Sequence, residues 1–154
     1  MQTERCFIGK ENGSLMADKN YLQPVMSKAQ VNAMSSLALA HVGDAVFELL
    51  VRLYLAEKGN ETSAGLHNAS VAMVNAGAQS RDVRQILPAL TEEELAVFHR
   101  GRNTRVNSMP RHAKTGEYHE ATGLEALMGY LYLMGRTERV STLFRMILEG
   151  CYAD

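Results

Sequence analysis

Two acidic side chains lie within segments that are otherwise mostly apolar, and these two residues are the best suited to carry chemistry. Asp44 lies in the run SLALAHVGDAVFELLVR, and Glu125 lies in EYHEATGLEALMGYLYLM. Burying an isolated carboxylate is unfavourable, so each acid must pair with a cation, take part in function, or lie at the edge of the core. If two helices brought the carboxylates together, they would repel each other, and a divalent cation with oxygen ligands would relieve that repulsion.

Glycines close to both acids favour such a meeting. Gly43 precedes Asp44, and Gly129 follows Glu125 by about one helical turn. Glycine inside a helix costs roughly 0.5–1 kcal/mol relative to alanine, a cost that a chain accepts where two backbones must come close. The alternative is that each acid meets an Arg, a Lys or a helix end and serves structure only. Glu48 has three interpretations: a further ligand, a group that orients the ligands from outside, or an ion-pair partner of Arg52 at i+4.

A basic stretch provides the second candidate for function. Between Leu95 and Gly116 the sequence has no Asp or Glu, but it has five cationic residues: Arg100, Arg102, Arg105, Arg111 and Lys114. Such a run is either a solvated surface or a phosphate-binding surface, and its length without acids favours the second. Double-stranded RNA can be held through phosphates and 2′-hydroxyls without aromatic platforms, which suits a chain with no Trp and four Phe. His67, in LHNAS, is either a surface residue or a phosphate contact.

Length and composition limit the class of protein. The chain has 154 residues, of which 46% are hydrophobic, and this size suits one compact domain. No apolar run reaches the roughly 18 to 20 residues of a membrane span, and the N-terminus lacks the apolar core of a secretory signal. The two cysteines are far apart and have no metal-binding spacing. We therefore expect a cytoplasmic protein with a mobile N-terminal extension at residues 1–20 and one domain at residues 21–154.

Helical periodicity and capping residues predict an all-α fold, with a short turn around Pro24 leading into it. Ser35 or Ser36 can cap the first long helix, Thr91 with Glu94 matches a capping box, and Gly101 is expected to open a long surface loop. The expected helices cover approximately residues 36–57, 62–87, 91–100, 117–134 and 137–150.

These segments together resemble the ribonuclease III family. HVGDAVFELLVR is similar to the family's signature helix, and LEALMGYLYL is similar to its second acidic helix, in the same order along the chain. The LHNAS, AQSRDV and RGRN elements extend the resemblance from about Val31 to the C-terminus. The whole pattern resembles the Mini-ribonuclease III branch, which has the catalytic domain and lacks a separate domain for binding double-stranded RNA.

The resemblance implies a homodimeric helical bundle in which each subunit cuts one strand of a duplex. The family's essential acids map onto Asp44 and Glu125, which would hold Mg²⁺, with Mn²⁺ as a substitute. Phosphodiester hydrolysis would leave 5′-phosphate and 3′-hydroxyl ends. The Mini branch further implies maturation of a 23S ribosomal RNA precursor, with the help of a ribosomal protein left open.

Some positions depart from the larger ribonuclease III enzymes, although they agree with the Mini branch. Leu37, Ala40 and Thr122 stand where the larger enzymes carry acids, which leaves the number of metal ions open. Glu48 and Thr122 are candidates to support the metal ligands from outside. The residues expected to grip the RNA backbone are Arg100, Arg102, Asn103, Arg105, Arg111 and Lys114, with His67. The alternatives are a non-catalytic duplex-RNA-binding or ribosome assembly factor with the same fold, and a helical interaction protein whose basic stretch is idle.

Overall fold

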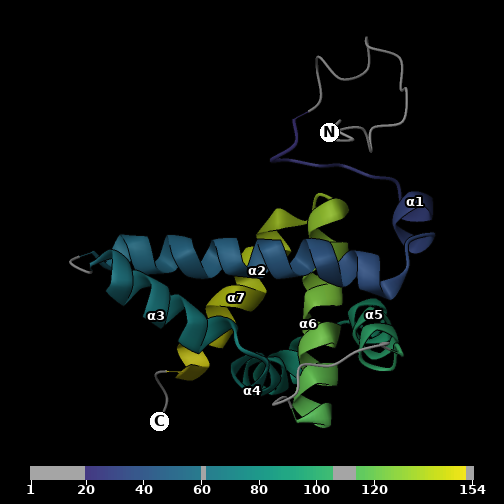
Figure 1. The fold of residues 1–154 in the computed structure, drawn as a ribbon. Helices are drawn as coiled ribbons and strands as arrows, with labels where there is room; N and C mark the ends of the chain where they lie inside the picture. Colours follow the sequence, from purple (N-terminus) through teal and green to yellow (C-terminus); the bar gives the residue numbers. More distant parts are fainter. Residues whose placement is uncertain (1–19, 60–61, 106–113, 152–154) are drawn as a thin grey trace, which may run out of the picture.

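The computed structural model describes residues 20–59, 62–105 and 114–151. The expected N-terminal extension, apart from Asn20, and Arg111 lie outside these ranges. The helices of the described part, drawn in Figure 1, are α1 (Lys28–Asn32), α2 (Ser36–Lys58), α3 (Ser63–Val74), α4 (Ala76–Ile86), the 3₁₀ helix η1 (Leu87–Ala89), α5 (Glu92–Arg102), α6 (Thr115–Leu133) and α7 (Thr137–Cys151).

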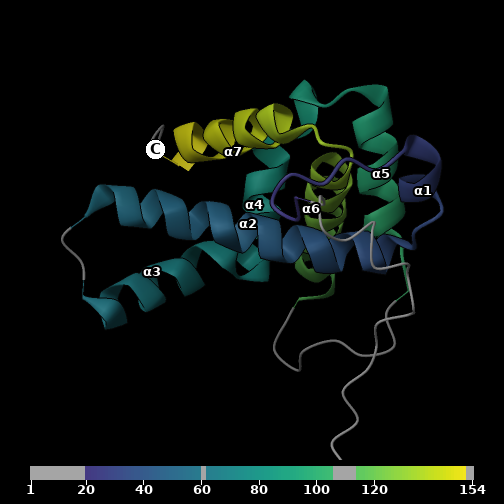
Figure 2. The ribbon, with the colours of Figure 1, turned by 90° about the horizontal axis from the view of Figure 1, so that it is seen from above.

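Helix α6 is the centre of the fold. From Ala121 to Leu131 every residue is buried except Glu125, which is half-buried. A helix that is apolar on all sides must have neighbours on all sides. Helix α2 runs across α6, while α4 and α5 flank it (Figures 1 and 2). Glu125 is therefore an acidic residue in the buried part of the central helix.

Helix α2 begins and ends where the sequence predicts. The Ser35 hydroxyl accepts a hydrogen bond from the Ala38 backbone N–H at 3.1 Å, and Gly59 ends the helix with a φ of 68°. The buried side of α2 also reaches α7, where the rings of Phe47 and Phe144 meet edge to face with centroids 5.8 Å apart.

The single helix predicted at residues 62–87 is wrong, because the chain breaks at Asn75 into α3 and α4. Asn75 has an extended backbone, with φ −71° and ψ 156°. Its side-chain Oδ1 accepts from the Ala78 N–H at 3.0 Å, and its Nδ2 donates to the carbonyls of Val71 and Ala72 at 3.2 and 2.8 Å. A short amide side chain thus replaces the helical hydrogen bonds at this point and turns the chain toward α6.

The surface loop predicted to begin at Gly101 is not present there, because α5 continues through Gly101 to Arg102. A Cβ on Gly101 would lie 2.7 Å from the Ala126 Cβ and 3.1 Å from the Gly123 Cα. Gly101 is therefore a packing position between α5 and α6, not the start of a loop. Two smaller differences from the expected helices are α1, which is an additional helix, and α7, which continues past Gly150 to Cys151.

The Thr91–Glu94 capping box is confirmed, and the acids that follow Thr91 fasten α5 to its neighbours. Glu93 accepts hydrogen bonds from the Tyr130 hydroxyl and from Arg136, each at 2.8 Å, and it pairs with Lys28. The pKa of Glu93 is lowered to about 2, mainly by the Lys28 ammonium and to a smaller extent by Arg136 and Tyr130. Helix α5, which carries Arg100 and Arg102, is thereby held in a defined position beside α6.

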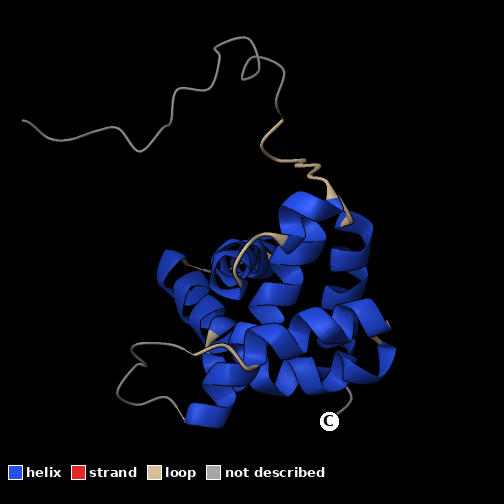
Figure 3. Ribbon diagram, turned by 90° about the vertical axis from the view of Figure 1, so that its right-hand side faces the viewer, coloured by secondary structure: helices blue, strands red, loops and turns tan. Residues whose placement is uncertain are grey.

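Every regular element in the described ranges is a helix (Figure 3). The all-α class expected from the sequence is confirmed.

Candidate active site

The backbones of α2 and α6 touch where they cross. A Cβ on Gly43 would lie 1.6 Å from the carbonyl oxygen of Glu125, and a Cβ on Gly129 would lie 2.0 Å from the carbonyl oxygen of Leu39. No side chain larger than hydrogen fits at either position without moving a helix. The close approach predicted from these two glycines is confirmed, and it brings the residues beside them, Asp44 and Glu125, to one place.

The two carboxyl groups at this crossing repel each other. Asp44 is exposed at the surface of α2, and Glu125 is half-buried on α6. Burial first, and then the charge of Asp44, raise the pKa of Glu125 to about 7, while the side-chain amide of Gln79 acts in the opposite direction. Within the described ranges neither acid forms a salt bridge. This arrangement favours chemistry over the purely structural alternative.

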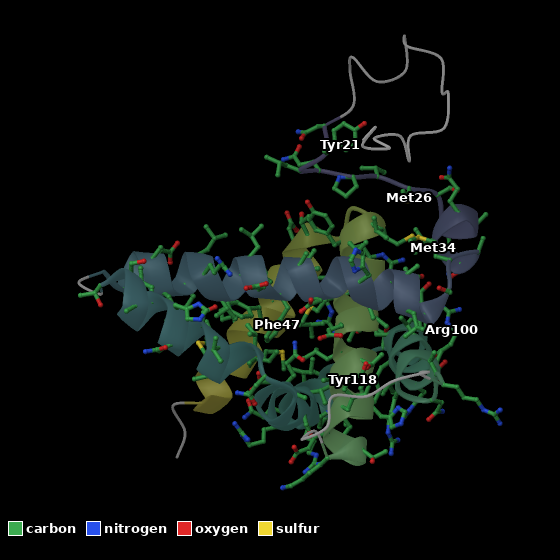
Figure 4. The ribbon with its side chains drawn as sticks, viewed as in Figure 1. Tyr21, Met26, Met34, Phe47, Arg100 and Tyr118 are labelled. Atoms are coloured by element: carbon green, nitrogen blue, oxygen red, sulfur yellow. The ribbon has the colours of Figure 1, made fainter. Side chains whose placement is uncertain are left out.

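A pocket of about 440 Å³ opens beside Glu125. Its walls come from the junction of α3 and α4 and from the first half of α6, where Tyr118 lies close to α4 (Figure 4). Gln79 lines this pocket although its side chain is only 1% exposed. Thr122, one turn before Glu125, is buried and donates its hydroxyl to the Tyr118 carbonyl at 2.9 Å. The carboxylate thus borders an open pocket that contains several polar side chains.

The donor set suits a hard divalent cation. Among the described residues, no three His, Cys, Asp or Glu side chains are grouped to hold a metal ion. Mg²⁺ often binds through one or two carboxylates and keeps several waters, so two facing acids at the protein surface are sufficient for it. The Gln79 Nε2 at this site has no hydrogen-bond partner in the described part of the chain. This buried N–H group is therefore available to donate to a carboxylate that binds a metal ion. Glu48 forms the ion pair with Arg52 that was one of its three predicted roles, and the Arg52 Nε donates to its Oε1 at 3.2 Å.

The cationic residues of the basic stretch that the structure describes are exposed. Arg100 lies on the outer side of α5 (Figure 4), and Arg102, Asn103 and Arg105 border a shallow pocket of about 430 Å³ together with the start of α6. Lys114 precedes α6 and approaches Glu117 at 3.4 Å. Arg102 and Arg105 thus present positive charge beside the start of the helix that carries Glu125.

His67 is not brought to this group. It is exposed on α3, which follows the C-terminal half of α2, whereas α5 lies at the other end of α2 (Figure 1). His67 instead borders a separate cleft of about 520 Å³ between α2 and α3, together with Arg52 and Ser70. A role in RNA binding for His67 remains a prediction.

Comparison with known proteins identifies the family. The ribonuclease III domain matches residues 37–136, which include all but the first residue of α2, all of α6 and both acids at their crossing. The chain belongs to the ribonuclease III family. It is therefore an endoribonuclease of the ribonuclease III type, and the family acts on double-stranded RNA.

Several relatives belong to the Mini-ribonuclease 3 branch. The chain is 38% identical to Mini-ribonuclease 3 of Clostridium tetani over 85% of this chain and 87% of that protein. It is 44% identical to Mini-ribonuclease 3 of Desulfitobacterium hafniense over 74% of this chain and 72% of that protein. A crystal structure of a Fusobacterium nucleatum protein superposes with a TM-score of 0.72 at 33% identity, and covers 79% of this chain and 97% of that one. In the part of the present chain that the structure describes, no helix is long and apolar enough to span a membrane.

Some residues at the ribonuclease III-type site were not singled out by the sequence. Gln79 stood out only as part of the AQSRDV element, and Asn75, which aims α4 at the site, lay inside an expected helix. Glu117 borders the pocket beside Glu125, and its Oε2 would lie 3.4 Å from a Cβ on Gly77. Polar residues on a half-buried helix give no signal of their own, because their role depends on the helix that they face.

Proposed function

We propose that this chain cleaves both strands of double-stranded RNA, with Asp44 and Glu125 as the catalytic acids that hold Mg²⁺. The observation that supports the proposal most is the meeting of two carboxylates without a salt bridge at the crossing of α2 and α6. Mn²⁺ is expected to substitute, because it prefers the same oxygen ligands.

The two acids have different positions and hence different tasks. Glu125 holds the cation from the inside of the site, and Asp44 holds it from the surface, where a phosphodiester can approach. The contact of the two backbones at Gly43 and Gly129 fixes the spacing of the carboxylates. When bound, the cation promotes attack by water and offsets the negative charge of the transition state. Hydrolysis is expected to leave 5′-phosphate and 3′-hydroxyl ends, as the family resemblance implies.

The basic residues of α5 and of the following loop hold the RNA backbone in this proposal. The exposure of Arg100, Arg102, Asn103, Arg105 and Lys114 supports it, and Arg111 falls in the adjoining segment outside the described residues. Arg and Lys contacts to phosphate carry no sequence information, so recognition depends on the shape of the duplex. This surface would then perform part of the task of the RNA-binding domain that larger ribonuclease III enzymes carry.

A homodimer is the second partner that we propose. Leu37, Leu49 and Leu53 are 44%, 49% and 52% exposed on α2, and Val71 is 49% exposed on α3. Exposed apolar side chains along the helix that also carries Asp44 suit a second copy of the chain, which would place one active site against each strand. Sedimentation equilibrium should give a dimer for the wild-type chain and a monomer for Leu53→Glu. A wild-type monomer at micromolar concentration would contradict the proposal.

The decisive experiment is cleavage of a long RNA duplex beside a matched single strand. We expect the duplex alone to be cut in Mg²⁺, no cleavage in EDTA, and none by Asp44→Asn or Glu125→Gln. Glu57→Gln, an exposed acid on the same helix as Asp44, is the matched control and should cleave normally. Variants that are inactive because they unfold, as judged by circular dichroism, would place the two acids in structural roles instead.

The substrate in the cell is proposed to be a precursor of 23S ribosomal RNA, as the resemblance to the Mini branch implies. A transcript of that precursor should be cut at a small number of sites, and addition of ribosomal proteins would reveal whether one of them assists. Binding of both the duplex and the precursor without cleavage, in Mg²⁺ and in Mn²⁺, would favour the alternative of a non-catalytic assembly factor.

A further inference from the structure

One buried polar group beside the proposed metal ligands has no partner. The Gln79 side chain is 1% exposed, and its Nε2 forms no hydrogen bond within the described part of the chain. Buried polar side chains nearly always have a partner, and an exception at a functional site requires an explanation. Gln79 lines the same pocket of about 440 Å³ as Glu125.

The backbone around Gln79 is held firmly. Its N–H donates to the Asn75 carbonyl at 3.0 Å, in the first turn of α4. The neighbouring residues Ala78 and Ser80 are buried, and the Ser80 hydroxyl donates to Glu120 of α6. The Gln79 amide consequently has little freedom to turn to the solvent, and it stays on the side of α4 that faces α6.

The group that this amide faces is the carboxyl group of Glu125. Both residues line the pocket between α4 and the first half of α6, where the Glu125 side chain is half-buried. An ionised carboxylate accepts stronger hydrogen bonds than a protonated one. A carboxylate that binds a cation keeps oxygen lone pairs that the cation does not use, so it can still accept a hydrogen bond from the Gln79 Nε2.

We infer that Gln79 is a positioning residue, whose amide holds the carboxylate of Glu125 in the orientation that binds the divalent cation. The inference rests on the proposed function, since it needs a cation at Asp44 and Glu125. Groups that hydrogen-bond metal ligands from outside restrict the orientation of those ligands, and their loss typically lowers metal affinity about 10- to 100-fold.

Gln79→Met separates this role from a role in packing. Methionine has a similar length and volume and lacks the amide, so the interior stays filled. In the metal-free protein the substitution removes a buried donor that has no partner, and the midpoint of thermal unfolding should not fall. In the same variant the affinity for Mn²⁺ should fall about tenfold. A residue that served packing alone would show the reverse combination, with lower thermal stability and unchanged metal affinity.

The test uses the full-length chain without RNA. Mn²⁺ binding is followed by the paramagnetic resonance signal of the free ion, and thermal unfolding is followed in EDTA. Gln79→Leu serves as a second variant that decides the question by the same criteria if Gln79→Met does not fold. Gln85→Met is the matched control, because Gln85 is on the same helix but its amide lies against Gly150 of α7. It should bind Mn²⁺ as the wild type does.

A second readout comes from RNA cleavage. The Mg²⁺ concentration for half-maximal cleavage should rise about tenfold in Gln79→Met, while the KM for duplex RNA stays unchanged. Wild-type Mn²⁺ affinity in the folded Gln79→Met protein would overturn the positioning role and leave the proposed function intact. A wild-type chain that binds no Mn²⁺ would overturn both.

Discussion

Replacement of Gly43 by alanine should destabilise the protein by about 3 kcal/mol, although alanine is the better helix former. Gly43 is inside α2, where alanine would by itself add about 1 kcal/mol of stability. The sign of the measured change therefore depends on the contact with α6, which makes this substitution a direct test of the crossing.

The magnitude follows from the geometry of the contact. The new Cβ would lie 1.6 Å from the Glu125 carbonyl oxygen, whereas ordinary contact begins at 3.4 Å. The helices would have to separate by about 1.8 Å, which is more than side-chain adjustment can supply in a close-packed interior. Overpacking typically costs about 1–3 kcal/mol where side chains can move, and here backbone meets backbone, so the net effect lies near the upper end of that range.

The assay is urea and thermal unfolding followed by circular dichroism. For a chain of this length, about 3 kcal/mol corresponds to a fall of roughly 6–12 °C in the midpoint. Gly116→Ala is the matched control, because Gly116 is in the first turn of α6 and nothing lies within 4 Å of an added Cβ. It should lie within about 0.5 kcal/mol of wild type. A Gly43→Ala protein as stable as the wild type would refute the proposed contact of α2 with α6.

Three further predictions concern Glu125, the start of α4 and the basic residues. In the metal-free protein, which is studied in EDTA, burial and the charge of Asp44 raise the pKa of Glu125 from its usual 4.5 to about 7. The stability that the protonated Glu125 contributes is therefore complete below pH 4.5 and is lost as the pH rises through 7. The free energy of unfolding of Glu125→Gln, relative to that of the wild type, should therefore increase by on the order of 3 kcal/mol from acid to alkaline pH. A difference that does not vary with pH would contradict this reasoning. Asn75→Ala should cost about 1–2 kcal/mol in urea unfolding, because α4 loses its cap, and a neutral result would mean that the break between α3 and α4 does not depend on this side chain. Finally, if Arg100, Arg102, Arg105 and Lys114 each neutralise one phosphate, duplex affinity should fall about 100-fold between roughly 50 and 200 mM salt, whereas an unchanged affinity would exclude their role.

The features that were predicted correctly depend on few neighbouring residues. The start of α2 at Ser35 and of α5 at Thr91 are set by hydrogen bonds between residues three positions apart, so a short piece of sequence contains the whole signal. The approach of α2 to α6 was also predictable, because glycine inside an apolar helix has a cost that only a close contact explains.

The errors occurred where the outcome depends on another helix. Asn75 fits a helical pattern as well as many residues do, and its extended backbone is favoured because α4 can then pack against α6. Glycine is common in loops, which is why a loop was predicted at Gly101. In the structure the space that a side chain would fill is occupied by Ala126 and Gly123 of α6. Neither partner is near in the sequence, so periodicity and capping contain no information about it.

The sequence by itself determined the all-α class and the family, and it singled out Asp44 and Glu125 as the acids proposed to bind metal. These features are expressed in periodicity, in local motifs and in residue types that an apolar helix would otherwise exclude. Only the tertiary structure decided that Glu48 pairs with Arg52, that His67 lies away from the basic residues, and that Gln79 faces Glu125. The reason is physical: a helix directs its side chains around its whole circumference, and which of them meet is settled by the packing of helices that are far apart in the chain.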